Sequence, residues 1–191
     1  MNYMVKKILL LLGSIFLAYQ SYTLLSLADQ FNTNSWGLII FVAWILNLII
    51  TGIFALAGFA LATQKLLPES YYKISHPAKL TKVYKYLGVD FFRKALLATL
   101  WKDKKQRKKY FNGKKQGIAN LSEQTMKSEF GHLLPFVVIV VVSVYLIMIG
   151  KSRLGVASMI INLIGNLYPV ILQRHHRMRI QNIGKWSAKN A

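Results

Sequence analysis

Four long apolar runs constrain this chain more than any other feature of its sequence. They lie at about 8–28, 36–63, 132–150 and 154–172. Each approaches or exceeds the roughly 20 helical residues that cross a bilayer core of about 30 Å. Charged residues make up only 16% of the chain, compared with about a quarter in a soluble domain. The sequence therefore predicts an all-α integral membrane protein with four transmembrane helices.

The positive charges are clustered, and their distribution predicts which way the helices run. The formal net charge is +19, and most of the lysines and arginines fall in the segment 64–131. Two lysines precede the first run, and a basic tail at 173–191 follows the fourth. The positive-inside rule places these segments, and so both termini, in the cytoplasm. Lys151 and Arg153 lie in a tight turn on the opposite side and are the exception.

The whole chain, 1–191, is interpreted as a single membrane domain with a cytoplasmic, interfacial segment at 64–131. Between Leu80 and Trp101, apolar and aromatic residues recur at helical spacing with basic residues interleaved. This pattern predicts an amphipathic helix, or two helices broken near Gly88, lying on the membrane surface. The basic run Lys102–Lys109 is expected to face anionic phospholipid headgroups, or else to receive a phosphorylated or carrier-borne substrate.

Composition argues against several classes of function. The chain has no cysteine, which excludes disulfides, thiolate nucleophiles and cysteine metal sites. No DNA- or RNA-binding signature accompanies the charge, so nucleic acid is not an expected partner. No metal site is expected from Glu129, His132, His175 and His176, because adjacent histidines on a helix point about 100° apart.

Polar residues bracket the last two apolar runs. Counted from the turn between these runs, His132 and Gln173 both lie about 27–29 Å away at the helical rise of 1.5 Å per residue. The two ends are therefore predicted to reach the cytoplasmic interface at one depth. Glu129 and His132 are three residues apart on one helical face, so the carboxylate can orient or charge-stabilise the imidazole.

The fourth run carries a polar stripe on an otherwise apolar helix. A stripe facing lipid would be costly, so it is expected to face the bundle interior or a cavity. Pro169 can kink this helix and free a backbone carbonyl nearby. The alternative is that its asparagines only form packing hydrogen bonds, as expected for Asn47 in the second run, and that its arginine is only a membrane anchor. The stripe consists of Asn162, Asn166, Gln173 and Arg177.

These residues suit acyl transfer at the headgroup plane. A histidine beside a carboxylate suits general-base removal of a hydroxyl proton. Arginines and a glutamine suit the binding of a phosphate or an oxyanion.

The same residues resemble the glycosyl-4,4'-diaponeurosporenoate acyltransferase family of bacterial carotenoid biosynthesis. In that family an E-x-x-H element precedes one apolar run, and Glu129 and His132 match it. An asparagine closes the next run and is followed seven residues later by Gln-Arg and further arginines. The matching residues here are Asn166, Gln173, Arg174, Arg177 and Arg179. The segment Tyr86–Trp101 also looks like the family's surface segment. The resemblance implies a multi-pass acyltransferase of a bacterial inner (plasma) membrane.

The resulting hypothesis is transfer of a fatty acyl group from a thioester donor, acyl-CoA or an acyl carrier, to a hydroxyl of a lipid or glycolipid. His132 is expected to be the general base, and Glu129 its orienting partner. Asn162, Asn166 and Gln173 are expected to position the acceptor or the carbonyl. Arg174 and Arg177 are expected to bind the donor phosphate or an anionic headgroup. No further cofactor is expected.

Two alternatives stay open. The chain is a non-catalytic assembly or partner-docking protein that uses its basic surface, or it carries out another lipid modification, such as methyl transfer, at the same site.

Overall fold

A computed structural model describes residues 2–31, 33–99, 101–103 and 117–189, apart from the side chains of 29 and 184–189. Most of the described residues are helical, and none of them forms a strand. Four helices are long and apolar enough to cross a membrane: Tyr3–Ser26, Trp36–Ala60, Gly117–Met148 and Ser152–Ile183. The predicted all-α, multi-pass membrane fold is confirmed, whereas the cytoplasmic placement of the termini stays a prediction.

The chain divides into two compact units. The first consists of Met1–Thr63 and Gly131–Leu167, and the second of Gln64–Phe130 and Tyr168–Ala191. The interpretation of 1–191 as a single membrane domain stays a prediction.

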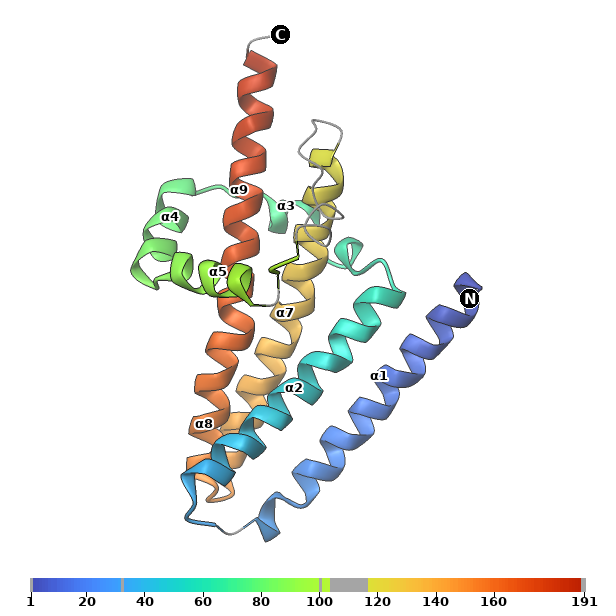
Figure 1. Ribbon diagram of the computed structural model, residues 1–191, viewed down its shortest axis with the longest axis vertical. Helices are drawn as coiled ribbons and strands as arrows, with labels where there is room; N and C mark the ends of the chain where they lie inside the picture. The colour runs from blue at the N-terminus through green and yellow to red at the C-terminus, as the bar shows by residue number, and fades with distance from the viewer. Residues whose placement is uncertain (1, 32, 100, 104–116, 190–191) are drawn as a thin grey trace. The chain divides into compact units, whose positions relative to one another are not determined.

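The first unit is a bundle of apolar helices (Figure 1). Its buried core is formed by aliphatic side chains from the helices and from the turn after α1. Its elements are α1 (Tyr3–Ser26), η1 (Ala28–Gln30), α2 (Trp36–Ala60), the end of α7 (Gly117–Met148), α8 (Ser152–Asn162) and the π-helical segment η3 (Leu163–Leu167).

Small residues let α1 and α2 approach closely along the length over which they run side by side (Figure 1). A Cβ on Gly52 would lie 2.8 Å from a methyl group of Leu17, and one on Gly13 would lie 3.1 Å from Leu56. Between these contacts, the Ser14 hydroxyl donates to the Ile53 carbonyl at 2.9 Å. Close approach at glycine and serine is how helices gain packing contacts where lipid supplies no hydrophobic drive.

Both interhelical turns of this unit lie at the same end of the bundle, where α2 and α8 begin. Lys151 donates to the Phe31 carbonyl at 3.2 Å, and Arg153 donates to Asn34 at 3.0 Å. The Arg153 guanidinium also lies 5.6 Å from the ring centre of Trp36. The two basic residues that depart from the charge pattern therefore hold one turn against the other.

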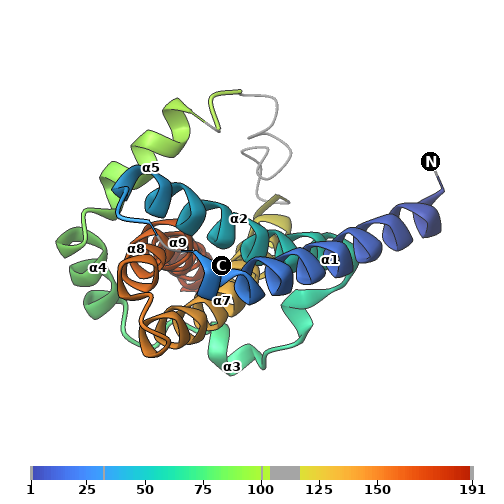
Figure 2. The same ribbon diagram turned by 90° about the horizontal axis from the view of Figure 1, so that it is seen from below.

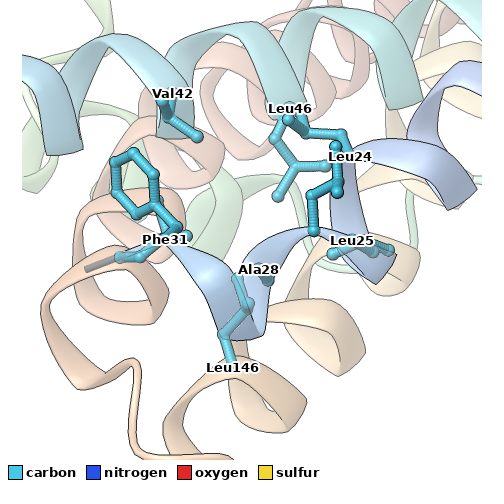
Figure 3. Close-up of a pocket in the computed structure, with 9 residues that line it drawn as sticks. Leu24, Leu25, Ala28, Phe31, Val42, Leu46 and Leu146 are labelled. Carbon is cyan, nitrogen blue, oxygen red and sulfur yellow. The ribbon is translucent and has the colours of Figure 1, made fainter.

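An apolar cavity of about 200 Å³ lies at this end of the unit (Figure 3). Leucines of α1 and α2 face it, and Ala28 and Phe31 close it from the connecting turn (Figure 3). Its lining is Leu24, Leu25, Leu27, Ala28, Phe31, Val42, Leu46, Leu146 and Leu154.

The second unit is built around α9 (Tyr168–Lys189), against which α4 (Pro77–Tyr86) and α5 (Val89–Ala98) pack (Figure 1, Figure 2). It also contains α3 (Glu69–Tyr72) and the start of α7. Gly88, at φ +64°, forms the break between α4 and α5. The left-handed conformation is accessible to glycine without a Cβ penalty. The predicted break near Gly88 is confirmed, whereas the position of the two helices on the membrane surface stays a prediction.

The helix ends differ from the limits of the apolar runs. α7 begins at Gly117 rather than near His132, and the fourth helix continues through α9 to Lys189. An apolar run marks only the part of a helix that crosses lipid, whereas good helix formers such as Lys, Gln, Glu and Met extend it into the polar phase. Within the predicted basic run Lys102–Lys109, residues 104–109 lie outside the described residues.

Gly155 provides a test of the hairpin formed by α7 and α8. A Cβ at this position would lie 2.6 Å from the Ser143 carbonyl oxygen, a backbone atom that cannot rotate away. We expect Gly155→Ala to lower the free energy of unfolding by about 1–3 kcal/mol through overpacking. Thermal unfolding in detergent or bilayers measures the change.

The matched control is Gly37→Ala in the first turn of α2. There the nearest atom to the new Cβ is the Ser35 hydroxyl at 3.9 Å. Alanine is a better helix former than glycine, so stability is expected to be unchanged or slightly higher. Equal stability of the Gly155→Ala protein and the wild type would contradict the close α7–α8 packing.

Candidate functional site

The polar residues selected from the sequence form two clusters, one in each unit. The first is centred on His132 of α7. Its Nδ1 atom lies 3.1 Å from Oδ1 of Asn166, which belongs to η3. The imidazole is half-buried, while the Asn166 side chain is buried. A histidine and an asparagine that are 34 residues apart in the sequence are therefore direct partners.

Asn166 is held by two further side chains. Its Nδ2 atom donates to the Thr51 hydroxyl of α2 at 3.1 Å and to Oδ1 of Asn162 at 3.0 Å. The Thr51 hydroxyl also lies within donating distance, 3.3 Å, of Asn166 Oδ1. Asn162 in turn donates through Nδ2 to the Phe136 carbonyl at 3.0 Å. Both asparagines are about as buried as a side chain can be, at 0% and 1% exposure, and both are hydrogen-bonded, as a low-dielectric interior requires.

The π-helical segment η3 lies at the centre of this cluster. It spans Leu163–Leu167, between α8 and α9, and was not predicted from the sequence. Single π-turns inside α-helices are frequently found at functional sites. Pro169 has no N–H to donate to the carbonyl four residues earlier, that of Gly165. The release of a backbone carbonyl by Pro169 stays a prediction.

A third buried asparagine of the first unit, Asn47, has a packing role. Asn47 Nδ2 lies 2.8 Å from the Ser158 hydroxyl and 3.2 Å from the Ser158 carbonyl. The interhelical hydrogen bond predicted for Asn47 is therefore confirmed. This bond joins α2 to α8. Thr51, four residues after Asn47 in α2, contacts Asn166.

The second cluster is centred on Glu129, which is fully buried in the second unit. Arg174 donates to one carboxylate oxygen at 2.8 Å, and Arg177 forms an ion pair with the other. Arg177 is itself 2% exposed and donates through Nε to the Tyr72 carbonyl at 2.8 Å. Two arginines therefore neutralise and hydrogen-bond a carboxylate that burial would otherwise destabilise.

Two tyrosines of α3 cover the arginines. The ring centre of Tyr71 lies 5.2 Å from the Arg174 guanidinium, and that of Tyr72 lies 5.0 Å from the guanidinium of Arg177. Burial, reinforced by the Glu129 charge, raises the pKa of Tyr72 to about 12. The same two causes, burial first, raise the pKa of Tyr71. Both phenols are therefore uncharged at neutral pH and present cation–π faces to the arginines.

The structure pairs some of the predicted residues with one another and gives others different partners. Asn162 and Asn166 are joined, as the stripe predicts, and His132 joins them. Arg177 instead pairs with Glu129, and Gln173 is half-buried without a hydrogen bond to the described residues. Because both Glu129 oxygens accept from arginines, its action on His132 stays a prediction. Arg179 is exposed. Among the described side chains, no three metal-ligating residues gather.

Sequence reasoning missed three of the partners. Thr51 had a usable signal, because it lies four residues after Asn47 and so on the same face of α2. The Phe136 and Tyr72 carbonyls had none, since every residue carries a carbonyl and only the fold selects which ones accept from a side chain.

Comparison with known proteins agrees with the sequence motifs. A family model described as glycosyl-4,4'-diaponeurosporenoate acyltransferase matches residues 68–185. The matched segment contains all of the predicted site residues and excludes α1 and α2. No curated protein and no solved structure matches the chain.

The Glu129 cluster predicts an unequal effect of the two arginines on stability. Arg177→Ala leaves a fully buried carboxylate with one partner and removes the contact with the Tyr72 carbonyl. Breaking a buried pair in this way is expected to lower the free energy of unfolding by about 3–5 kcal/mol. Arg174→Ala serves as the comparison, because that side chain is 27% exposed, and we expect a clearly smaller loss. Denaturant or thermal unfolding measures both, and equal losses would contradict the assignment of Arg177 as the structural partner.

Proposed function

Because the chain belongs to the glycosyl-4,4'-diaponeurosporenoate acyltransferase family, we propose that it transfers a fatty acyl group from a thioester donor to a hydroxyl of a lipid or glycolipid. The family match supports the reaction class, and the four apolar helices support an acceptor that is dissolved in the membrane. The proposed location is a bacterial inner membrane, with the reaction on its cytoplasmic face.

The observation that carries the proposal is the placement of His132. It lies in the segment that matches the family, and a buried asparagine holds one nitrogen of its imidazole. An imidazole fixed in this way suits general-base catalysis, in which the base must be oriented before the substrate arrives. The other nitrogen, Nε2, has no side-chain partner among the described residues and is the one proposed to act.

The proposed step balances without a further reactant. The lone pair of His132 takes the proton of the acceptor hydroxyl while its oxygen attacks the thioester carbonyl carbon. An ester C–O bond forms, the C–S bond breaks, and the imidazolium returns the proton to the thiolate that leaves. The expectation that Gln173 positions the acceptor or the carbonyl stays a prediction.

Arg174 is the proposed contact for the donor. Acyl-CoA and acyl carriers both present phosphate, which an arginine binds through paired N–H donors. Of the two arginines on Glu129, Arg174 is the partly exposed one and Arg177 is buried. Arg177 is therefore proposed to hold Glu129 in place rather than to bind donor phosphate, which revises the role expected from the sequence.

A substitution at His132 tests the proposal. In cells carrying His132→Ala, the acylated lipid should fall by a factor on the order of 10²–10⁴, the usual contribution of a general base. Mass spectrometry of total lipids and carotenoids measures this loss, with cells lacking the protein as the reference for complete loss.

His76→Ala is the matched control, because His76 is exposed at the start of α4 and is not assigned to the site. Its lipid profile should equal that of the wild type. Identical profiles in the wild type, His132→Ala and cells lacking the protein would refute the proposed activity and favour the non-catalytic docking role.

A further inference from the structure

We infer that Asn162 and Asn166 are positioning residues that fix the tautomer of His132, with the proton on Nδ1 and the lone pair on Nε2. The tautomer follows from a chain of hydrogen bonds inside the first unit. Its importance for turnover rests on the proposed function, whereas the tautomer itself does not.

The series of hydrogen bonds starts at a group that can only accept. The Phe136 backbone carbonyl can accept a hydrogen bond but not donate one. Asn162 Nδ2 lies 3.0 Å from it. Rotating the Asn162 amide by 180° would place Oδ1 against the carbonyl oxygen, so two acceptors would face each other in a buried site. Leaving buried polar atoms unpaired in this way is costly, and the Phe136 carbonyl therefore fixes which way Asn162 points.

The orientation passes from Asn162 to Asn166. With Asn162 Nδ2 on the carbonyl, its Oδ1 atom faces Asn166 and accepts from Asn166 Nδ2 at 3.0 Å. Thr51 does not decide the matter, because a hydroxyl both donates and accepts and can adapt to either orientation of the amide. The Asn162 oxygen cannot adapt, so it selects the orientation in which Asn166 presents Oδ1 to the histidine.

The last step fixes the proton. Asn166 Oδ1 is an acceptor and lies 3.1 Å from His132 Nδ1, so Nδ1 must be the donor. A neutral imidazole carries one N–H, and the other nitrogen is then the acceptor. Nε2 is left with the lone pair that a general base needs. Setting the tautomer through the hydrogen bond on the other ring nitrogen is the general way in which proteins prepare a histidine.

Amides suit this task within a membrane-spanning helix better than a carboxylate does. An aspartate at position 166 would also accept from Nδ1, but it would bring a charge into a bundle surrounded by lipid. Two buried amides transmit the same orientation without any charge.

The tautomer is measured directly by solid-state NMR on ¹⁵N-histidine-labelled protein in lipid bilayers. The chain has four histidines, and the His132 signal is the one that disappears in His132→Gln. We expect the neutral wild-type imidazole to show a protonated Nδ1 and an unprotonated Nε2. A wild-type His132 protonated on Nε2 instead would overturn the inference without any variant being needed.

Asn162→Leu tests the relay, because Asn162 does not touch the histidine. Removing it frees the Asn166 amide to rotate, so we expect both tautomers of His132 to appear. Asn47→Leu is the matched control. It removes another buried interhelical amide, the one bonded to Ser158, and should leave the His132 signals unchanged. An unchanged tautomer in Asn162→Leu, or the same change in Asn47→Leu, would refute the relay.

Kinetics separate a positioning role from substrate binding. For Asn162→Leu, kcat should fall on the order of 10²-fold with KM little changed, because Asn162 is fully buried, its amide bonds to Phe136 and Asn166, and the inference assigns it to positioning His132 rather than the acceptor. If His132→Ala proves fully active, the proposed function fails while the NMR result still decides the tautomer. If the wild-type tautomer is the wrong one, the inference fails whatever the activity of His132→Ala.

Discussion

A buried polar group in a helix surrounded by lipid must find its partner inside the protein, and this requirement shapes the first unit. With no water in the hydrocarbon core, an unpaired amide or hydroxyl costs several kcal/mol. The Nδ2 group of Asn47 bonds to Ser158, and that of Asn162 bonds to the Phe136 carbonyl. Each of these bonds joins two different helices. The same contacts that remove the cost of burial therefore hold α2 to α8 and α8 to α7.

Short hydrogen bonds between helices need backbones that come close, and small residues provide this. Gly155 leaves the start of α8 in contact with the Ser143 backbone of α7. One turn of α8 after Gly155, Ser158 hydrogen-bonds to Asn47. One turn after that, Asn162 hydrogen-bonds to the Phe136 carbonyl. A larger residue at position 155 would push α8 away from α7 and lengthen the bond between Asn162 and Phe136. Packing and hydrogen bonding are therefore not separate contributions here.

The sequence was sufficient for the features that depend on local pattern. The apolar runs predict the four spanning helices. Gly88 predicts the break between α4 and α5, because glycine adopts the positive φ of such a break without a Cβ penalty. The spacing of Asn162 and Asn166 predicts that they share a face. The partner of Glu129 was not predictable in the same way. A spacing of three from His132 permits an interaction along the helix, but it cannot compete with two arginines that the fold brings to the carboxylate from α9.

The π-helical segment shows a second limit of pattern reading. Helical periodicity assumes 3.6 residues per turn, so the stripe was extended from Asn166 through Gln173 to Arg177 as one face. The wider turn at Leu163–Leu167 interrupts that periodicity. No residue type marks a π-turn in a single sequence, although Pro169 indicates that the regular hydrogen-bond ladder is broken nearby. The residues on either side of the turn accordingly have different partners.

The family match leaves α1 and α2 outside its limits, yet α2 contributes to the site. Thr51 hydrogen-bonds to Asn166, and Asn47 holds α8 one turn of α2 earlier. Thr51 adapts to either orientation of the Asn166 amide, whereas the carbonyl of Phe136 and the amide of Asn162 do not. The two groups that fix the direction of the hydrogen bonds therefore lie within the segment that matches the family model. Thr51 of α2 can donate or accept, so its hydroxyl is compatible with the direction that these groups determine. A helix with this task can vary in sequence as long as it keeps a hydroxyl, or another group that both donates and accepts, at the position of Thr51.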